Sequence, residues 1–239
     1  MTDKMEPIIR TNEVTKDYGN GQVPVHALRG IDFTLDKGEF AAIAGPSGSG
    51  KSTFLNIIGG LDRPTSGTVE LEGREITALS ASDLSTLRRD RIGFVFQHYN
   101  LVPVYTALEN AEYVLMLQGV PREERRVRVA RIFHEVGLDG LEDRFPHKLS
   151  GGQQQRVAIA RAIAPEPALV LADEPTANVD SKAAGRLLDL MRRLNEEKGI
   201  TFLFSTHDPS VMRRASRLII LQDGRIEHDG PPPEILRLD

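Results

Sequence analysis

The chain has 239 residues, of which 40% are hydrophobic and 27% charged, and 34 acidic side chains outnumber 30 basic ones. This length suits one α/β domain, and the net charge of −4 argues against a nucleic-acid-binding face. The absence of cysteine excludes disulfides and thiolate metal sites. No apolar run has signal-peptide length at the N-terminus or approaches the ~20 residues that span a bilayer, so we expect a soluble protein.

Strands and turns dominate the first third of the chain. An apolar run at residues 39–45 leads directly into a glycine-rich loop, which predicts a buried strand. After the loop, residues 51–61 predict a helix, because apolar side chains recur there at helical spacing. The apolar face of this predicted helix consists of Phe54, Ile57, Ile58 and Leu61. Further strands are predicted at residues 25–30, 31–36, 68–73 and 92–97.

The middle of the chain changes to helical patterns. Three helices are predicted there: 106–118, Pro121 to Gly137, and from Gly151 to the residue before Pro165. The last third alternates again, with strands at 168–174 and 200–208, helices at 181–199 and 209–216, and a hairpin at 217–230 that turns at Asp223-Gly224. Apolar strands separated by helices predict an α/β fold with a buried parallel sheet.

The glycine-rich loop GPSGSGKS has the spacing of a phosphate-binding P-loop. Its glycines let the backbone bend until successive N–H groups point at phosphate oxygens, and the following helix adds its positive end. Lys51 can reach the β- and γ-phosphates, and the Ser52 hydroxyl can ligate Mg²⁺. The residues that we predict to bind the nucleotide here are Gly45, Pro46, Ser47, Gly48, Ser49, Gly50, Lys51, Ser52 and Thr53.

Four polar side chains lie at the ends of three apolar strands, where parallel sheets gather their active residues. Asp173 ends the strand LVLAD and suits the Mg²⁺ site, and Glu174 next to it can accept the proton of an attacking water. Gln97 ends the strand IGFVFQ and is a further candidate to ligate the metal. His207 follows the strand ITFLFST and is a candidate for the γ-phosphate and for catalysis, as is Lys51.

A second glycine-containing stretch, LSGGQQQR, predicts another anion site. Ser150, Gly151, Gly152 and Gln153 open a predicted helix, so they offer free N–H groups, a hydroxyl and a positive dipole end. A simple helix start is the alternative, because serine and glycine are good N-caps.

Taken in this order, these elements resemble the ATP-binding cassette ATPases along essentially the whole chain. Tyr18 resembles the adenine-stacking aromatic, GPSGSGKS the Walker A loop, Gln97 the Q-loop, LSGGQ the signature and ALVLADEP the Walker B strand with its catalytic glutamate. His207 resembles the switch histidine, and ANVD the D-loop, whose Asp180 serves communication within the dimer. The D-loop departs from the usual TGNLD or TGALD pattern, because it reads TANVD.

The resemblance implies how such a chain works. Two copies dimerise head to tail around two ATP molecules, so the residues at 150–153 bind the nucleotide of the other copy, and Mg²⁺ is the metal. ATP hydrolysis then loosens the dimer and drives integral membrane subunits, which places the chain peripherally at the cytoplasmic face of the cell (inner) membrane. The resemblance also implies a P-loop NTPase core with an N-terminal antiparallel β subdomain and an inserted helical subdomain. We expect one domain over 1–239, with the core and β subdomain at 1–95 and 165–239 and the helical subdomain at 96–164.

The segments GNGQVPVHALRG, RRDRIGFVFQHYNLVPVYTALENAE and LSGGQQQRVAIARA resemble the lipoprotein-releasing, macrolide-export and haem-export cassettes of bacteria and archaea. The cell-division cassette, which signals through a membrane partner without transport, is the alternative. The DNA-repair cassettes carry a coiled-coil insertion that this chain lacks, and translation-factor cassettes carry two cassettes where this chain has one. The transported cargo is not encoded in this chain, because membrane subunits choose it.

Overall fold

The computed structural model describes residues 7–19 and 24–235. Part of the segment GNGQVPVHALRG, residues 20–23, lies outside the described residues, as do residues 1–6 and 236–239. The elements in chain order are β1 (Pro7–Tyr18), β2 (Val25–Asp36), β3 (Phe40–Ala44), α1 (Lys51–Ile58), β4 (Ser66–Leu71), β5 (Arg74–Glu75), α2 (Ala81–Arg91), β6 (Ile92–Val95), α3 (Ala107–Leu117), α4 (Arg122–Val136), η1 (Pro146–Lys148), α5 (Gly151–Ile163), β7 (Leu169–Asp173), α6 (Ser181–Lys198), β8 (Thr201–Thr206), α7 (Pro209–Arg214), β9 (Arg217–Gln222), β10 (Arg225–Gly230) and α8 (Pro232–Ile235).

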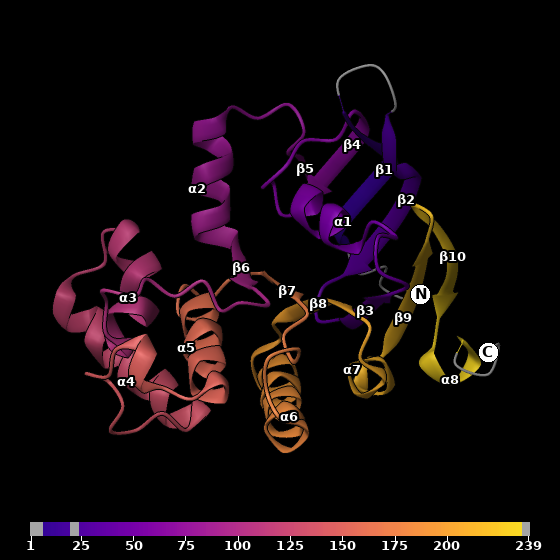
Figure 1. Ribbon diagram of the computed structural model, residues 1–239. Coiled ribbons are helices and arrows are strands. Elements are labelled where there is room, and N and C mark those ends of the chain that lie inside the picture. The colour runs from indigo at the N-terminus through magenta and orange to yellow at the C-terminus, as the bar shows by residue number, and fades with distance from the viewer. Residues whose placement is uncertain (1–6, 20–23, 236–239) are drawn as a thin grey trace, which may run out of the picture.

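Two sheets organise these elements. The larger sheet has the order β10-β9-β3-β8-β7-β6, in which all neighbours are parallel except the β9–β10 hairpin. The smaller sheet, β2-β1-β4-β5, is antiparallel. Figure 1 shows α3, α4 and α5 gathered at one side of the molecule, away from the antiparallel sheet and α1. The predicted α/β architecture with a parallel sheet, an antiparallel β part and a helical part is therefore confirmed.

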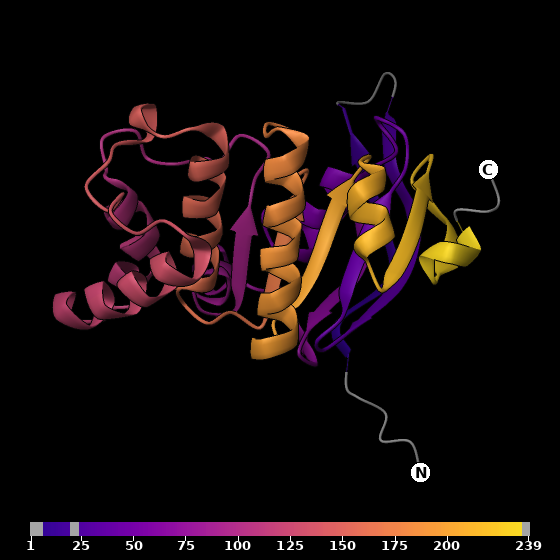
Figure 2. The same cartoon turned by 90° about the horizontal axis from the view of Figure 1, so that it is seen from below.

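The central strands β3, β7 and β8 of the larger sheet are buried because they are mostly apolar, whereas the edge strand β10 is polar and mostly exposed. Alternate residues of β3 enter different cores: Phe40, Ala42 and Ala44 pack with α5 and α6, whereas Ala41 and Ile43 pack with α1 and the antiparallel sheet. Figure 2 shows α6 and α7 together on one face of this sheet. The parallel sheet thus forms the middle layer of the molecule, and its carboxyl edge can carry polar groups without weakening either core.

The predicted helix at residues 51–61 is too long. The helix α1 ends at Ile58, because Gly59 and Gly60 follow and Gly60 adopts a left-handed φ of 64°. Leu61 therefore does not extend the apolar face and is 45% exposed, whereas Phe54, Ile57 and Ile58 are buried as predicted.

Other predictions differ from the structure mainly in the first third. The segments at 25–30 and 31–36 form one strand, β2, with Gly30 at φ 78°. The sequence patterns did not predict the strand β1, which ends at Tyr18, or the helix α2. The three middle helices and the hairpin are confirmed, and both turn residues, Asp223 and Gly224, have the positive φ of a two-residue hairpin turn.

Candidate functional site

The phosphate loop joins β3 to α1, and glycine is required at both of its ends. At Gly45, with φ 150°, an added Cβ would lie 2.0 Å from the Leu221 carbonyl oxygen. At Gly50, with φ 105°, it would lie 2.5 Å from the Ala27 carbonyl oxygen. The strands on either side therefore press against the loop and hold its backbone in a curve that only glycine permits.

Lys51 is the first residue of α1 and is only 8% exposed. Its Nζ donates hydrogen bonds to the carbonyl oxygens of Gly45, at 2.8 Å, and Pro46, at 2.9 Å. Burial lowers the pKa of this ammonium group, while the nearby charges of Glu174 and Asp173 act in the opposite direction. The lysine is thus held over the concave side of the loop, where an anion would replace the two carbonyl contacts.

Ser52 and Asp173 bring hard oxygen donors together, because the Ser52 hydroxyl donates to Asp173 Oδ1 at 3.1 Å. The two residues are far apart in sequence and meet because β3 and β7 both end at the carboxyl edge of the sheet. Gln97, after β6, lines the same cavity as Ser52. A hydroxyl, a carboxylate and an amide oxygen fit the ligand preference of Mg²⁺, which takes few protein ligands besides phosphates.

Glu174 and His207 form a pair at the same edge. Glu174 Oε1 lies 2.7 Å from His207 Nδ1, and its Oε2 accepts from the Thr206 hydroxyl at 3.3 Å. The Glu174 side chain is 13% exposed, whereas the His207 side chain is 72% exposed. Glu174 also has a φ of 45°, a left-handed conformation that non-glycine residues adopt only where the surroundings hold it. The carboxylate is therefore fixed, and the imidazole faces solvent.

One open cavity of about 590 Å³ collects these side chains. Its lining includes Ser47, Gly48, Gly50, Lys51, Ser52, Thr53, Gln97, Glu174 and His207. The strand β2 contributes Val25, His26 and Ala27. This cavity suits a nucleoside triphosphate, because it is large enough and combines Lys51 with oxygen donors at its edge. The cavity thus brings the phosphate loop together with Gln97, Glu174 and His207. The predicted residues Gly45, Pro46, Ser49 and Asp173 do not line it, although Asp173 accepts a hydrogen bond from Ser52, which does.

Tyr18 lies outside the lining of this cavity, at the end of β1, and is 41% exposed. Its hydroxyl donates to Asp62 Oδ2 at 2.8 Å, and Lys16 Nζ lies 4.8 Å from the centre of its ring. Lys16 also donates to Asp62 Oδ1 at 2.8 Å, so the carboxylate holds both residues. Sequence patterns gave no signal for Lys16 or Asp62, because they become neighbours only when β1 pairs next to β4.

The residues of the LSGGQ stretch are not brought to this cavity. Ser150 is the N-cap of α5, its hydroxyl accepts from the Gln153 N–H at 3.3 Å, and the Gln153 side chain accepts from the Ser150 N–H at 2.8 Å. This reciprocal capping box fixes the helix start while Gly151 and Gly152 stay half-buried. Asp180 is likewise the N-cap of α6 and accepts from the Ala183 N–H at 2.9 Å, a hydrogen bond that lowers its pKa.

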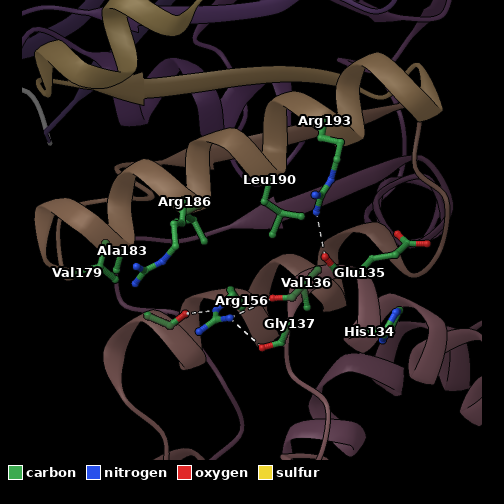
Figure 3. Close-up of a pocket in the computed structure, with 12 residues that line it drawn as sticks. His134, Glu135, Val136, Gly137, Arg156, Val179, Ala183, Arg186, Leu190 and Arg193 are labelled. Atoms are coloured by element: carbon green, nitrogen blue, oxygen red, sulfur yellow. Dashed lines mark hydrogen bonds between the residues drawn. The ribbon is translucent and has the colours of Figure 1, made fainter.

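A second cavity, of about 240 Å³, lies where α4, α5 and α6 meet (Figure 3). Arg156 projects from α5 and donates to the carbonyl oxygens of Val136, at 3.2 Å, and Gly137, at 2.8 Å. Arg193 of α6 donates to the Glu135 carbonyl oxygen at 3.1 Å. Arginine side chains thus fasten the C-terminal end of α4 to both α5 and α6, so the cavity is a joint between the helical part and the core.

Fold and cavity together define a nucleotide-binding protein of the P-loop class. A family model described as ABC transporter matches residues 28–177. The chain therefore belongs to the ABC transporter family, as an ATP-binding cassette of that family.

Relatives and solved structures agree with this assignment. A lipoprotein-releasing system ATP-binding protein of Anaeromyxobacter dehalogenans is 48% identical over 226 residues, which cover 94% of this chain and 95% of that protein. A macrolide export ATP-binding/permease protein of Paracoccus denitrificans is 44% identical over 229 residues, 96% of this chain but 34% of that protein. A solved dimeric, post-hydrolysis state of an ATP-binding cassette bound to ADP and Pi is 44% identical and has a TM-score of 0.87, with 94% of this chain and 98% of that chain covered. Both kinds of relative belong to the branch that the sequence resembled.

Proposed function

We propose that the chain is the ATP-hydrolysing motor subunit of an ABC transporter or extraction complex and that it works as a head-to-tail ATP-sandwich dimer. The observation that carries this proposal is the separation of the two predicted anion sites. The nucleotide cavity holds Lys51, Glu174 and His207, but no residue of 150–153 lines it. A second copy is therefore needed to bring Ser150, Gly151, Gly152 and Gln153 to the bound nucleotide.

Each side chain in or beside the cavity takes a role that its position supports. The phosphate-loop N–H groups and Lys51 bind the phosphates, and Tyr18 stacks on the adenine with the ring face that Lys16 leaves open. Ser52, Gln97 and Asp173 would hold Mg²⁺, which neutralises phosphate charge when it is bound.

Glu174 accepts a proton from the attacking water, because its carboxylate is fixed at the cavity edge and its neighbours donate to it. His207 donates from its ring to Glu174 Oε1 in one tautomer, and its exposed ring can turn towards the γ-phosphate. Asp180 transmits the state of one nucleotide to the other copy through the D-loop. Ala177 and Val179 leave the Asp180 cap of α6 intact, since the carboxylate still bonds the Ala183 N–H.

An apolar groove supports a membrane subunit as the further partner. Phe94, Phe96 and Leu117 line a hollow of about 310 Å³ that extends to Asn100, in the loop after Gln97. Leu117 is 50% exposed and Leu61 on the opposite rim is 45% exposed. Exposed apolar surface of this kind marks interaction sites. A partner bound in this groove would contact the loop that carries Gln97, so its binding would respond to the nucleotide.

None of the helices within residues 7–19 and 24–235 is both long and apolar enough to cross a bilayer. Through the membrane partner, we propose that the chain lies peripherally at the cytoplasmic face of the cell (inner) membrane. Residues 96–164 serve as the helical subdomain that carries the signature, and residues 1–95 and 165–239 serve as the nucleotide-binding core. The groove is lined by both parts, with Phe94 from the core and Leu117 from the helical subdomain.

Mixing two inactive variants tests the dimer. A Lys51→Ala subunit lacks the phosphate-binding lysine, and a Ser150→Arg subunit lacks a working signature, so each alone should hydrolyse little ATP. In a mixed dimer one composite site keeps both intact halves, and phosphate release should recover in the mixture. Activity that stays at the level of the separate variants, although mixed dimers form, would contradict the proposal.

Co-purification of a membrane subunit, followed by a substrate-release assay, separates transport from cell-division-type signalling.

A further inference from the structure

Two loops that lie far apart in sequence are tied together beside the start of α5. The Tyr99 hydroxyl, in the loop after β6, donates to the Asn178 carbonyl oxygen at 3.0 Å. In return, the Asn178 side-chain amide donates to the Gln97 carbonyl oxygen at 2.6 Å. The loop that contains Gln97 and the loop that precedes Asp180 are therefore joined by two hydrogen bonds.

The backbone at Tyr99 is held in an uncommon conformation. Tyr99, with φ 62°, and Asn100, with φ 48°, are consecutive non-glycine residues in the left-handed region. Such strain persists only where the surroundings impose it. Arg161 of α5 imposes it, because its guanidinium donates to the Tyr99 carbonyl oxygen at 2.8 Å and to the Asn100 carbonyl oxygen at 2.6 Å. Burial lowers the pKa of this guanidinium, which reports how far it is removed from water.

The other end of α5 meets the same loop. A Cβ added at Gly151 would lie 2.8 Å from the Tyr99 hydroxyl oxygen and 2.9 Å from the Asn178 carbonyl oxygen. Both ends of α5 thus bear on Tyr99: Arg161 near the C-terminal end holds its backbone, and Gly151 at the N-terminal end touches its side chain. A shift of the Gln97 loop therefore cannot leave the start of α5 unchanged.

Gln155 is a buried polar residue near the same end of α5. It lies one turn after Gly151 on the same face of α5. Its side chain is 0% exposed, and neither amide atom has a hydrogen-bond partner among the described residues. A buried amide without partners is unfavourable and demands an explanation. Movement of α5 relative to the two tied loops would give this amide new neighbours.

We propose that Tyr99 is a positioning residue that links the loop of Gln97 to the start of α5, and so aligns the signature for the nucleotide of a second copy. The inference rests on the proposed function, because it assumes that residues 150–153 act in a dimer. When Gln97 engages the nucleotide, the bonds through Asn178 move the Tyr99 hydroxyl, which contacts Gly151. Tyr99 itself does not line the cavity.

Tyr99→Phe removes only the hydroxyl and tests this link. The measurement is ATP-dependent dimerisation by sedimentation in a Glu174→Gln background, together with the affinity of the monomer for a fluorescent ATP analogue. We expect dimer association to weaken about three- to tenfold, the usual net worth of one hydrogen bond, and kcat to fall in the Glu174 protein. Monomer affinity for nucleotide and KM should stay unchanged. Tyr105→Phe is the matched control, because no hydrogen bond from the Tyr105 hydroxyl is present among the described residues, and it should behave like the parent protein.

Unaltered dimerisation in Tyr99→Phe would overturn the proposal, as would an equal loss of monomer nucleotide affinity, which indicates a merely structural role. Asn178→Ala sharpens the test because it removes the second bond between the same loops. If the two bonds form one link, the effects of Tyr99→Phe and Asn178→Ala are less than additive, and additive effects would count against the link. A parent protein that fails to dimerise with ATP would reject the proposed dimer itself and with it this inference.

Discussion

The nucleotide cavity and the start of α5 are built in opposite ways. In the cavity, charged groups from several strands face one another: Lys51 lies near Asp173 and Glu174, and Glu174 pairs with His207. At the start of α5 the polar groups satisfy themselves, because Ser150 and Gln153 cap each other. The first region has the groups for chemistry, whereas the second is a finished helix end, which the proposed dimer would present to the nucleotide of the other copy. Two glycine-containing motifs that look alike in sequence can therefore differ in how many polar groups they leave for a ligand.

We expect the largest effect from a substitution in the nucleotide cavity. Glu174→Gln keeps the shape and the hydrogen bond to His207 but removes the base, so kcat should fall about 10²- to 10⁴-fold. ATP binding should persist. Phosphate release and binding of a fluorescent ATP analogue measure the two quantities. Glu227→Gln, at an exposed position of β10, is the control and should turn over normally. Normal turnover in Glu174→Gln would sink the assignment of this residue.

We expect the next largest effect from a substitution at the start of α5. Gly151→Ala forces the Tyr99 hydroxyl and the Asn178 carbonyl to give way, because the new Cβ would lie under 3.0 Å from both. A displacement of this kind can lower turnover roughly 100-fold, while ATP binding by the separate subunit stays intact. At Gly152 the added Cβ would meet only Ala183, at 3.5 Å, and Val179, at 4.0 Å. Gly152→Ala should therefore cost less, and an equal loss in both variants would argue against steric displacement through Tyr99.

We expect the smallest effect from a substitution at Asp62, which holds Tyr18 beside the nucleotide cavity. Asp62→Asn weakens the hydrogen bonds that hold Tyr18 and Lys16, so the KM for ATP should rise about two- to fivefold with kcat unchanged. Steady-state kinetics with ATP measure this split. A change in kcat without a change in KM would contradict the proposal that Asp62 supports adenine binding through Tyr18.

The same variant has a defined pH dependence. Burial raises the pKa of Asp62, but the hydrogen bonds from Lys16, Tyr18 and the Arg63 N–H outweigh it, so the pKa lies below its ordinary value of 3.8. A lowered carboxyl pKa stabilises the fold above the ordinary value, and this contribution is lost as the pH falls through the folded-state pKa. The difference in the free energy of unfolding between parent and Asp62→Asn should therefore be largest at neutral pH and shrink below about pH 3.8. Urea unfolding across this range checks it, and a constant difference contradicts it.

Local patterns predicted the elements whose signal is periodic or conformational. Ser150 and Gly137 mark helix ends, and Asp223-Gly224 marks a turn, because each acts through its own backbone. The strand β1 was missed because its burial pattern is irregular: the register shifts several times along β1 and its neighbours. The helix α2 was missed because only Leu84 and Leu87 of its eleven residues are buried.

For the site, the strand-end residues were predictable because parallel strands end at one edge, so Asp173, Glu174 and His207 had to converge. Tyr99, Asn178 and Arg161 carried no such signal. Their contacts depend on the angle at which α5 packs against the loops, which is set by the helical part as a whole. Asp62 likewise reaches Tyr18 only through the pairing of β1 with β4.

The strand that carries the phosphate loop, β3, lies between β8 and β9, which come from the end of the chain. The Leu221 carbonyl presses on Gly45, and the Gly224 N–H donates to the Ser49 carbonyl oxygen at 3.1 Å. During synthesis the phosphate loop is made before the strands that hold it, because β9 and β10 follow it in the chain. A chain that ends before β9 therefore lacks the Leu221 and Gly224 contacts that keep the loop in its curve.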